Sequence, residues 1–195
     1  MASSMDTGQS GCWSRSSGSE ATMEKSVERS CHGKVMRRVA GLLVSLGFQR
    51  VKSTFFIRRQ VWVIEFIHLH KYSFTPGYRV HLGIRVLNDV FPAPALNGPD
   101  SHPYLCPNSP NGSKYILGFG PDQASIERCS AEIYRWCSDV GMPWFNQFNG
   151  PQALLTDAAS PLGESEKSRL RLAMGGESDP DAVRASLSLL GLEDD

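Results

Sequence analysis

The fold is decided by residues 61–87, which read VWVIEFIHLHKYSFTPGYRVHLGIRVL. Two runs rich in β-branched and aromatic residues flank the turn-forming segment Lys71–Gly77. This pattern predicts two antiparallel strands, Val61–His70 and Tyr78–Leu87. Side chains alternate between the two faces of a strand, and one face of the second strand is entirely aliphatic. That face is expected to lie under helices and to form the core.

The opposite face of the hairpin combines aromatic, histidine and arginine side chains. If His70 lies opposite Arg79, then His68 lies directly opposite His81, with Cβ atoms about 5 Å apart. A face with this mixture of side chains is typical of a binding surface. The candidate ligand-binding residues are Arg58, His68, His70, Arg79, His81 and Arg85.

Upstream, apolar residues at helical spacing predict a helix from His32 to Leu46 that Gly47 ends. A strand follows at Ser53–Arg58, and a tight turn joins it to the hairpin. This strand is expected to add Phe56 and Arg58 to the histidine-bearing face.

Downstream, Lys114–Phe119 is a candidate fourth strand, and Pro121-Asp122 begins a second helix that ends at Gly141. The predicted fold is therefore α+β. It has an N-terminal helix, an antiparallel meander of three or four strands, and a C-terminal helix packed on one sheet face. Residues 1–30 are predicted to be a disordered tail, 31–157 a single domain, and 158–195 a loosely attached helical tail.

Composition narrows the classes of function. The chain has 20 basic and 20 acidic residues, and this balance argues against a general nucleic-acid binder, although a local basic patch stays open. No apolar run is long enough to span a membrane, and the N-terminus has no signal-like apolar segment. The five cysteines form no C-x-x-C pair, so we expect reduced thiols in the cytoplasm, with no metal and no cofactor.

Three groups of residues are candidates for catalytic or metal-binding roles, each with a plainer structural alternative. The histidines could bind a metal or act as acid and base, or they could be ordinary half-exposed sheet residues. Glu65 lies among aliphatic side chains and is expected to pair with Arg128 or Arg135 of a helix. Cys106 with His102, in the Pro-rich segment 88–113, is a weaker candidate nucleophile.

Five segments resemble a mainly bacterial, uncharacterised family, domain of unknown function 4304. They are LGFQR at 46–50, TFFIR at 54–58, Val63–Lys71, YRVHLGI at 78–84 and MPWF at 142–145. The resemblance covers Val35 to Leu155 and implies the fold more than an activity. His68 and His81 stand where the family shows Gln and Asn, which implies a polar patch that hydrogen-bonds a ligand. The segment 88–113 is longer than its counterpart in the family.

The sequence thus favours a non-enzymatic binding module that recognises a protein or a small anionic ligand on the open sheet face. One alternative is a small hydrolase or nuclease-like enzyme that uses His68 and His81 with Arg79 or Arg85. A second alternative is a weak RNA binder that uses aromatic and basic side chains of the same face.

Overall fold

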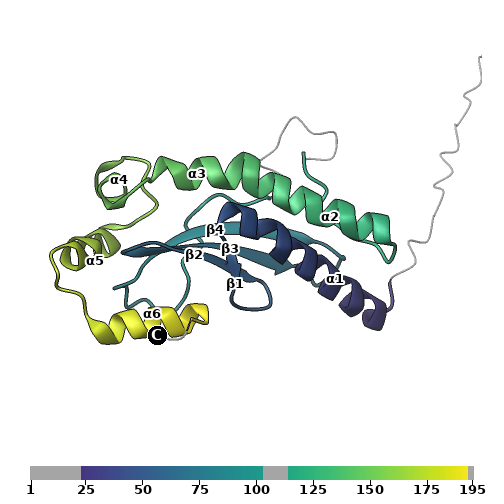
Figure 1. The fold of residues 1–195 in the computed structure, drawn as a ribbon, viewed down its shortest axis with the longest axis horizontal. Helices are drawn as coiled ribbons and strands as arrows, with labels where there is room; N and C mark the ends of the chain where they lie inside the picture. The colour runs from purple at the N-terminus through teal and green to yellow at the C-terminus, as the bar shows by residue number, and fades with distance from the viewer. Residues whose placement is uncertain (1–22, 103–113, 193–195) are drawn as a thin grey trace, which may run out of the picture.

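The computed structural model describes residues 23–102 and 114–192, which form an antiparallel sheet with helices on both faces (Figure 1). The strands follow one another in space in chain order. They are β1 (Gln49–Arg50), β2 (Phe55–Arg59), β3 (Val63–Lys71) and β4 (Tyr78–Val86). The predicted α+β meander is confirmed.

The fourth strand is not the predicted one. It is the short β1, which pairs with β2, whereas Lys114–Phe119 contributes an isolated bridge between Gly118 and Gly77. This segment reaches the sheet only at the β3–β4 turn, where Tyr78 N–H donates to the Leu117 carbonyl (3.1 Å). Further along β4 the backbone of residues 98–101 already pairs with the edge of the strand, since Ser101 N–H donates to the Val80 carbonyl and Leu82 N–H to the Pro99 carbonyl, so Lys114–Phe119 has no edge left to extend along.

Helices α1 (Lys25–Leu43) and α2 (Gln123–Trp136) pack against one face of the sheet and form the main core with it. This is the aliphatic face predicted from the sequence. A 3₁₀ turn, Val44–Leu46, extends α1, and Gly47 ends it with φ 83°, the left-handed conformation expected there. The buried apolar residues of α1 are Cys31, Val35, Met36, Val39 and Leu43.

The first helix begins earlier than predicted. Residues 25–30, which the sequence placed in a disordered tail, are helical, and residues 1–22 lie outside the described part of the chain. Glu28 forms an ion pair with Lys71 of β3. This contact with the sheet stabilises the first turns of α1, and no local periodicity could have revealed it.

The second helix begins as predicted, because the Asp122 side chain accepts a hydrogen bond from Ser125 N–H (2.8 Å). It does not end at Gly141. A π-helical turn, η3 (Cys137–Gly141), leads directly into α3 (Met142–Gln147). A Cβ at Gly141 would lie 3.3 Å from the Leu82 side chain, so this glycine lets the helix approach β4 closely instead of ending it.

The remaining helices carry the chain round the end of the sheet to its other face (Figure 1). They are α4 (Pro151–Thr156), α5 (Glu164–Met174) and α6 (Pro180–Leu190). Leu187 and Leu190 of α6 are buried in a second apolar cluster with sheet residues. The tail predicted as loosely attached is thus packed on the sheet, because its one apolar stripe meets Ile57, Ile64, Phe66 and Leu87.

Candidate functional site

The predicted register of the histidine face is confirmed. In the β3–β4 ladder His68 lies opposite His81, and His70 lies opposite Arg79. The three imidazole ring centroids are 6.0, 6.2 and 6.3 Å apart. We call these four residues the histidine face. Helix α6 covers the other end of the same sheet surface, so this surface is open only around the four residues of the histidine face.

His68 and His81 carry little charge at neutral pH. Burial, then the neighbouring His81 and His70, lowers the pKa of His68 to about 4. Burial and the positive charge of Arg79 lower the pKa of His81, which Asp100 partly offsets. Arg79 donates a hydrogen bond of 2.6 Å to Asp100 and is thereby neutralised. This arrangement does not attract an anion.

The ring geometry of the histidine face does not favour metal or acid–base chemistry. The His68 and His81 rings lie nearly parallel, at 21°, and Phe55 stacks on His68 with centroids 4.4 Å apart. The His70 ring stands edge-on to both, at 78° and 84°. Within residues 23–102 and 114–192, no group of three or more His, Cys, Asp or Glu side chains is placed to hold a metal ion.

Acidification is expected to destabilise the protein through His68. In the unfolded chain this imidazole takes up a proton near pH 6.5, but in the folded protein only near pH 4. Between these values the unfolded state binds more protons, so stability falls as the pH falls from 6.5 to 4. Because the ring is half-buried, we expect a loss of about 1–2 kcal/mol, measured by urea unfolding. His68→Gln should lose correspondingly less stability, and equal losses in the two proteins would contradict the assignment.

Arg85, a predicted ligand-binding residue, is 3% exposed and binds the protein itself. Its guanidinium donates to the carbonyls of Asp89, Phe91 and Ala93 at 2.8–3.1 Å and to the Ser186 hydroxyl at 3.0 Å. It also pairs with the Asp89 carboxylate at 3.1 Å. Arg85 therefore fastens the segment after β4 and helix α6 to the sheet, and it is not available to a ligand on this face.

Arg58 and Phe56 lie on the helix-covered face, not on the histidine face as predicted. Arg58 is opposite Glu65 in the β2–β3 ladder, and Phe55 takes the place beside His68. Paired residues share a face, and Phe56 lies opposite Ile67, so both Phe56 and Arg58 belong with Glu65 and Ile67 on the face under α1 and α2. The same register corrects the partner of Glu65, which is Arg58 of the neighbouring strand and not a helix arginine.

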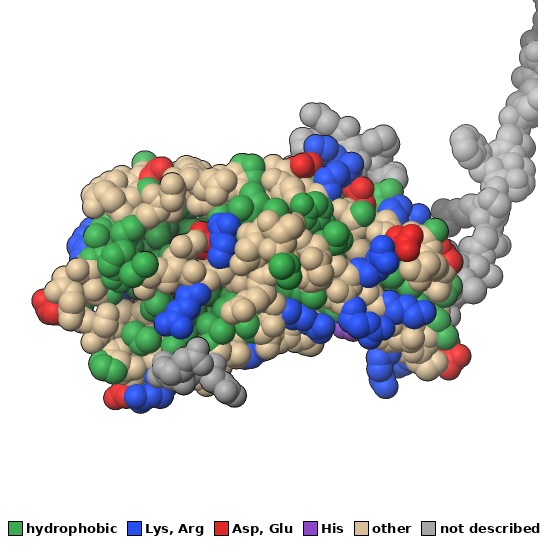
Figure 2. Space-filling model, viewed as in Figure 1, with side chains coloured by type: hydrophobic (Ala, Val, Ile, Leu, Met, Phe, Trp, Pro, Cys, Tyr) green, Lys and Arg blue, Asp and Glu red, His purple; other side chains and the backbone are tan. Residues whose placement is uncertain are grey.

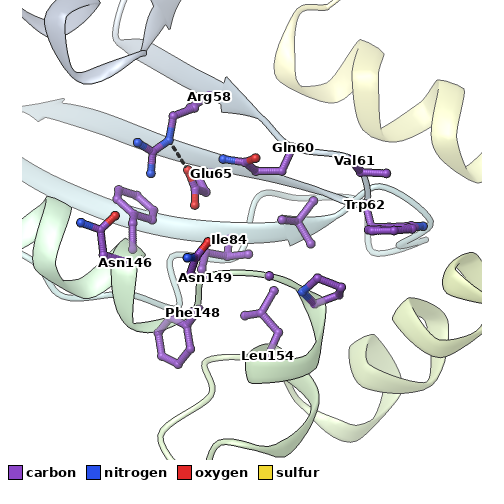
Figure 3. Close-up of a pocket in the computed structure, with 14 residues that line it drawn as sticks. Arg58, Gln60, Val61, Trp62, Glu65, Ile84, Asn146, Phe148, Asn149 and Leu154 are labelled. Carbon is purple, nitrogen blue, oxygen red and sulfur yellow. Dashed lines mark hydrogen bonds and ion pairs between the residues drawn. The ribbon is translucent and has the colours of Figure 1, made fainter.

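The structure places Arg58 and Glu65 in a cavity of about 340 Å³ (Figure 3). We call it the ion-pair pocket. Glu65 is 6% exposed, and the Arg58 guanidinium lies over the rings of Phe48 and Phe145, 5.1 and 5.7 Å from their centroids. The remaining wall combines carboxamide and apolar side chains. Its main contributors are Gln60, Trp62, Ile84, Asn146, Phe148, Asn149 and Leu154.

One carboxylate oxygen of Glu65 remains available to a ligand. Arg58 Nε binds the other oxygen, and Arg58 Nη1 donates to the Leu46 carbonyl at 3.3 Å. Among the described residues no hydrogen bond engages Glu65 Oε1, and Figure 3 shows this oxygen pointing into the cavity, towards Asn149. The ion pair thus offers one acceptor at the base of the pocket while its net charge is zero.

Sequence reasoning missed the ion-pair pocket because its two walls come from segments about 80 residues apart. One wall is the β2–β3 turn and the other is the α3–α4 connection. In the MPWF segment, which the sequence marked through the family resemblance, Phe145 packs in the core at 1% exposure. The only local signal for the polar rim was the Asn-Gly-Pro run at 149–151, where Gly150 turns the chain with φ 97°.

The thiols offer no reactive group in the described residues. Cys31, Cys129 and Cys137 are all buried in the core, and burial raises the pKa of the Cys129 and Cys137 thiols to about 12. Cys106, the candidate nucleophile, lies outside the described part of the chain.

The chain matches no family model, no curated protein and no solved structure. The resemblance to domain of unknown function 4304 therefore stays a prediction. In the described residues, no helix has the length and apolarity needed to cross a membrane.

Proposed function

We propose that the protein is a non-enzymatic binding module whose ligand occupies the ion-pair pocket. The observation that carries this proposal is the uncommitted oxygen of Glu65, held at the base of a cavity by a salt bridge and facing carboxamide side chains. A buried carboxylate is costly to keep unless its hydrogen bonds are made. A ligand that donates to this oxygen would complete them.

The lining of the pocket supports binding without catalysis. Its fourteen described residues include no Ser, Thr, Cys, His, Lys or Tyr. Its two ionisable side chains, Arg58 and Glu65, are engaged with each other. Nucleophilic or general-base chemistry needs a group that can give or take a proton during the reaction. A carboxylate held in an ion pair is better suited to accepting a hydrogen bond from a ligand.

The chemistry of the walls defines the ligand as neutral, small and amphipathic. It would donate to Glu65, pair with the amides of Asn146 and Asn149, and place an apolar or aromatic group against Trp62 and Phe148. The volume, about 340 Å³, is at the lower end of small-molecule sites, which start near 300 Å³. The proposal moves the site away from the histidine face and replaces an anionic ligand by a neutral one.

We expect Asn146→Ala/Asn149→Ala to weaken ligand binding at least tenfold. Each lost hydrogen bond contributes about 0.5–1.5 kcal/mol, and both side chains are exposed, so the fold should be unaffected. The measurement is ligand-observed NMR with nicotinamide, uracil, adenine and N-acetyltyrosinamide, the last representing a protein side chain. Acetate and phosphate are the charged comparisons.

The matched control is Gln147→Ala, an exposed carboxamide of α3 that does not line the pocket. It should bind the panel like the wild type. Binding of acetate or phosphate in preference to the neutral probes would refute the ligand class. Binding that survives in the double variant would refute the site, and so would a wild type that binds none of the probes.

A further inference from the structure

The neutral total charge of the chain conceals a separation of charge. Residues 23–71 contain ten basic and three acidic residues, a net charge of +7. Residues 114–192 contain seven basic and ten acidic residues, a net charge of −3. The absence of a long-range field, expected from the whole-chain balance, therefore does not hold for the first half of the described domain.

The positive charge is concentrated on the outer surface of α1 and the adjacent strand β1. Figure 2 shows Lys and Arg side chains gathered over the end of the molecule where α1 lies. Arg29 and Arg37 are about 80° apart round the helix, and Lys34 is one turn from Arg37. Helix α1 and β1 expose six such side chains, Lys25 among them, and we call the other five the α1 basic surface. They are Arg29, Lys34, Arg37, Arg38 and Arg50.

Acidic partners are scarce on this surface. Of its five side chains, only Arg38 has an acidic partner among the described residues, Glu127 at 3.4 Å. Arg50 is held by the backbone carbonyls of Lys52 (3.2 Å) and Ser53 (2.8 Å), which keep its guanidinium in place without neutralising it. The surface thus presents four cations that have no acidic partner among the described residues, and one of them, Arg50, is held in place by the backbone.

We propose that the α1 basic surface binds the phosphodiester backbone of duplex nucleic acid without reading its sequence. Four of the five cations are arginines, whose planar fork suits phosphate oxygens. The 19-residue helix is about 28 Å long, enough to follow about eight base pairs of one strand. The exposed side of α1 carries no aromatic residue, so it favours a duplex backbone over stacked single-stranded bases.

A membrane surface fits these observations less well. A helix that binds lipid does so by inserting its apolar face between the headgroups. The apolar face of α1 is committed to the core, where Val35, Val39 and Leu43 are 0% exposed. Only the weaker electrostatic attraction would remain for lipid.

The test is fluorescence anisotropy with a labelled 20-base-pair DNA duplex of mixed sequence, from 50 to 200 mM KCl. The wild type should bind, with an affinity that falls steeply as salt rises. Arg29→Gln/Lys34→Gln/Arg37→Gln should bind at least tenfold more weakly at 50 mM KCl. Its salt slope should be smaller by about two to three, since each neutralised phosphate contributes about 0.9.

The matched control, Lys114→Gln/Arg171→Gln/Arg184→Gln, removes the same charge from exposed positions outside the α1 basic surface. It should stay within twofold of the wild type. All three proteins should have the same thermal unfolding midpoint, because the replaced side chains are exposed. The proposal is overturned if the wild type does not bind the duplex at 50 mM KCl. It is also overturned if the two triple variants lose the same amount of affinity for the duplex. A third contradicting result would be tighter binding to 70:30 phosphatidylcholine:phosphatidylserine vesicles than to the duplex. None of these results bears on the ion-pair pocket.

Discussion

Replacing Arg85 by Met is expected to lower the free energy of unfolding by about 3–5 kcal/mol. Methionine replaces the aliphatic stem of the side chain but removes the guanidinium with all its donors. Asp89, itself 6% exposed, would keep a buried charge without its partner. The carbonyls of Phe91 and Ala93 would lose their donor from Arg85, while the Asp89 carbonyl would keep the Ser186 hydroxyl as its donor.

The measurement is urea unfolding at pH 7, with Arg59→Met as the matched control. Arg59 belongs to the same sheet but is exposed, so its replacement should change stability by less than 1 kcal/mol. If Arg85→Met left the stability unchanged, the hydrogen bonds of the Arg85 guanidinium would not be what holds α6 on the sheet. Ligand binding in the ion-pair pocket is a second measurement, and we expect Arg85→Met to leave it unchanged while the protein is folded, since Arg85 does not line the pocket.

The contrast between the two hairpins shows how far strand register can be predicted from sequence. In β3 and β4 the apolar alternation is long and the turn between them is rich in turn formers, so only one register buries the aliphatic face. The pairing of His68 with His81 followed from this. The strand before them is short, and its turn leaves two registers that both bury aromatic residues. Phe56 and Arg58 were therefore assigned to the histidine-bearing face, whereas the observed pairing of Arg58 with Glu65 places them on the opposite one.

The burial of Arg85 illustrates a different limit. Its face was predicted correctly, because alternation alone places it beside His81. What covers that face is helix α6, about 100 residues later in the chain, and strand alternation carries no information about such long-range packing. The ion-pair pocket was beyond prediction for the same reason, since Asn146 and Asn149 have no local pattern that marks them as ligand-binding.

The charge separation, in contrast, was readable from the sequence. Counting Lys, Arg, Asp and Glu in windows, instead of over the whole chain, shows the basic first half directly. The structure adds that these residues gather on one exposed surface, since helix α1 turns its apolar side to the core. A net charge of zero is thus a poor guide to partners when the two signs lie in different parts of the fold.

Glu65→Leu is expected to lower the free energy of unfolding by about 2–3 kcal/mol. Removing one partner of a buried ion pair costs about 3–5 kcal/mol. Here the loss should be smaller, because Arg58 is 21% exposed and water in the pocket can hydrate it. The double variant Arg58→Met/Glu65→Leu should recover to within about 1 kcal/mol of the wild type, since an apolar pair packs against Phe48 and Phe145.

Stability and recognition should therefore separate in the double variant, because it restores packing but lacks the acceptor that faces the cavity. We expect it to unfold in urea near the wild-type midpoint and yet to bind the neutral probes at least tenfold more weakly by NMR. The control is Glu65→Gln, whose amide oxygen can still accept from Arg58 and whose remaining NH₂ faces the ligand as a donor. It should stay folded but prefer probes that present an acceptor. A stable double variant that binds like the wild type would show that the ion pair serves only the fold.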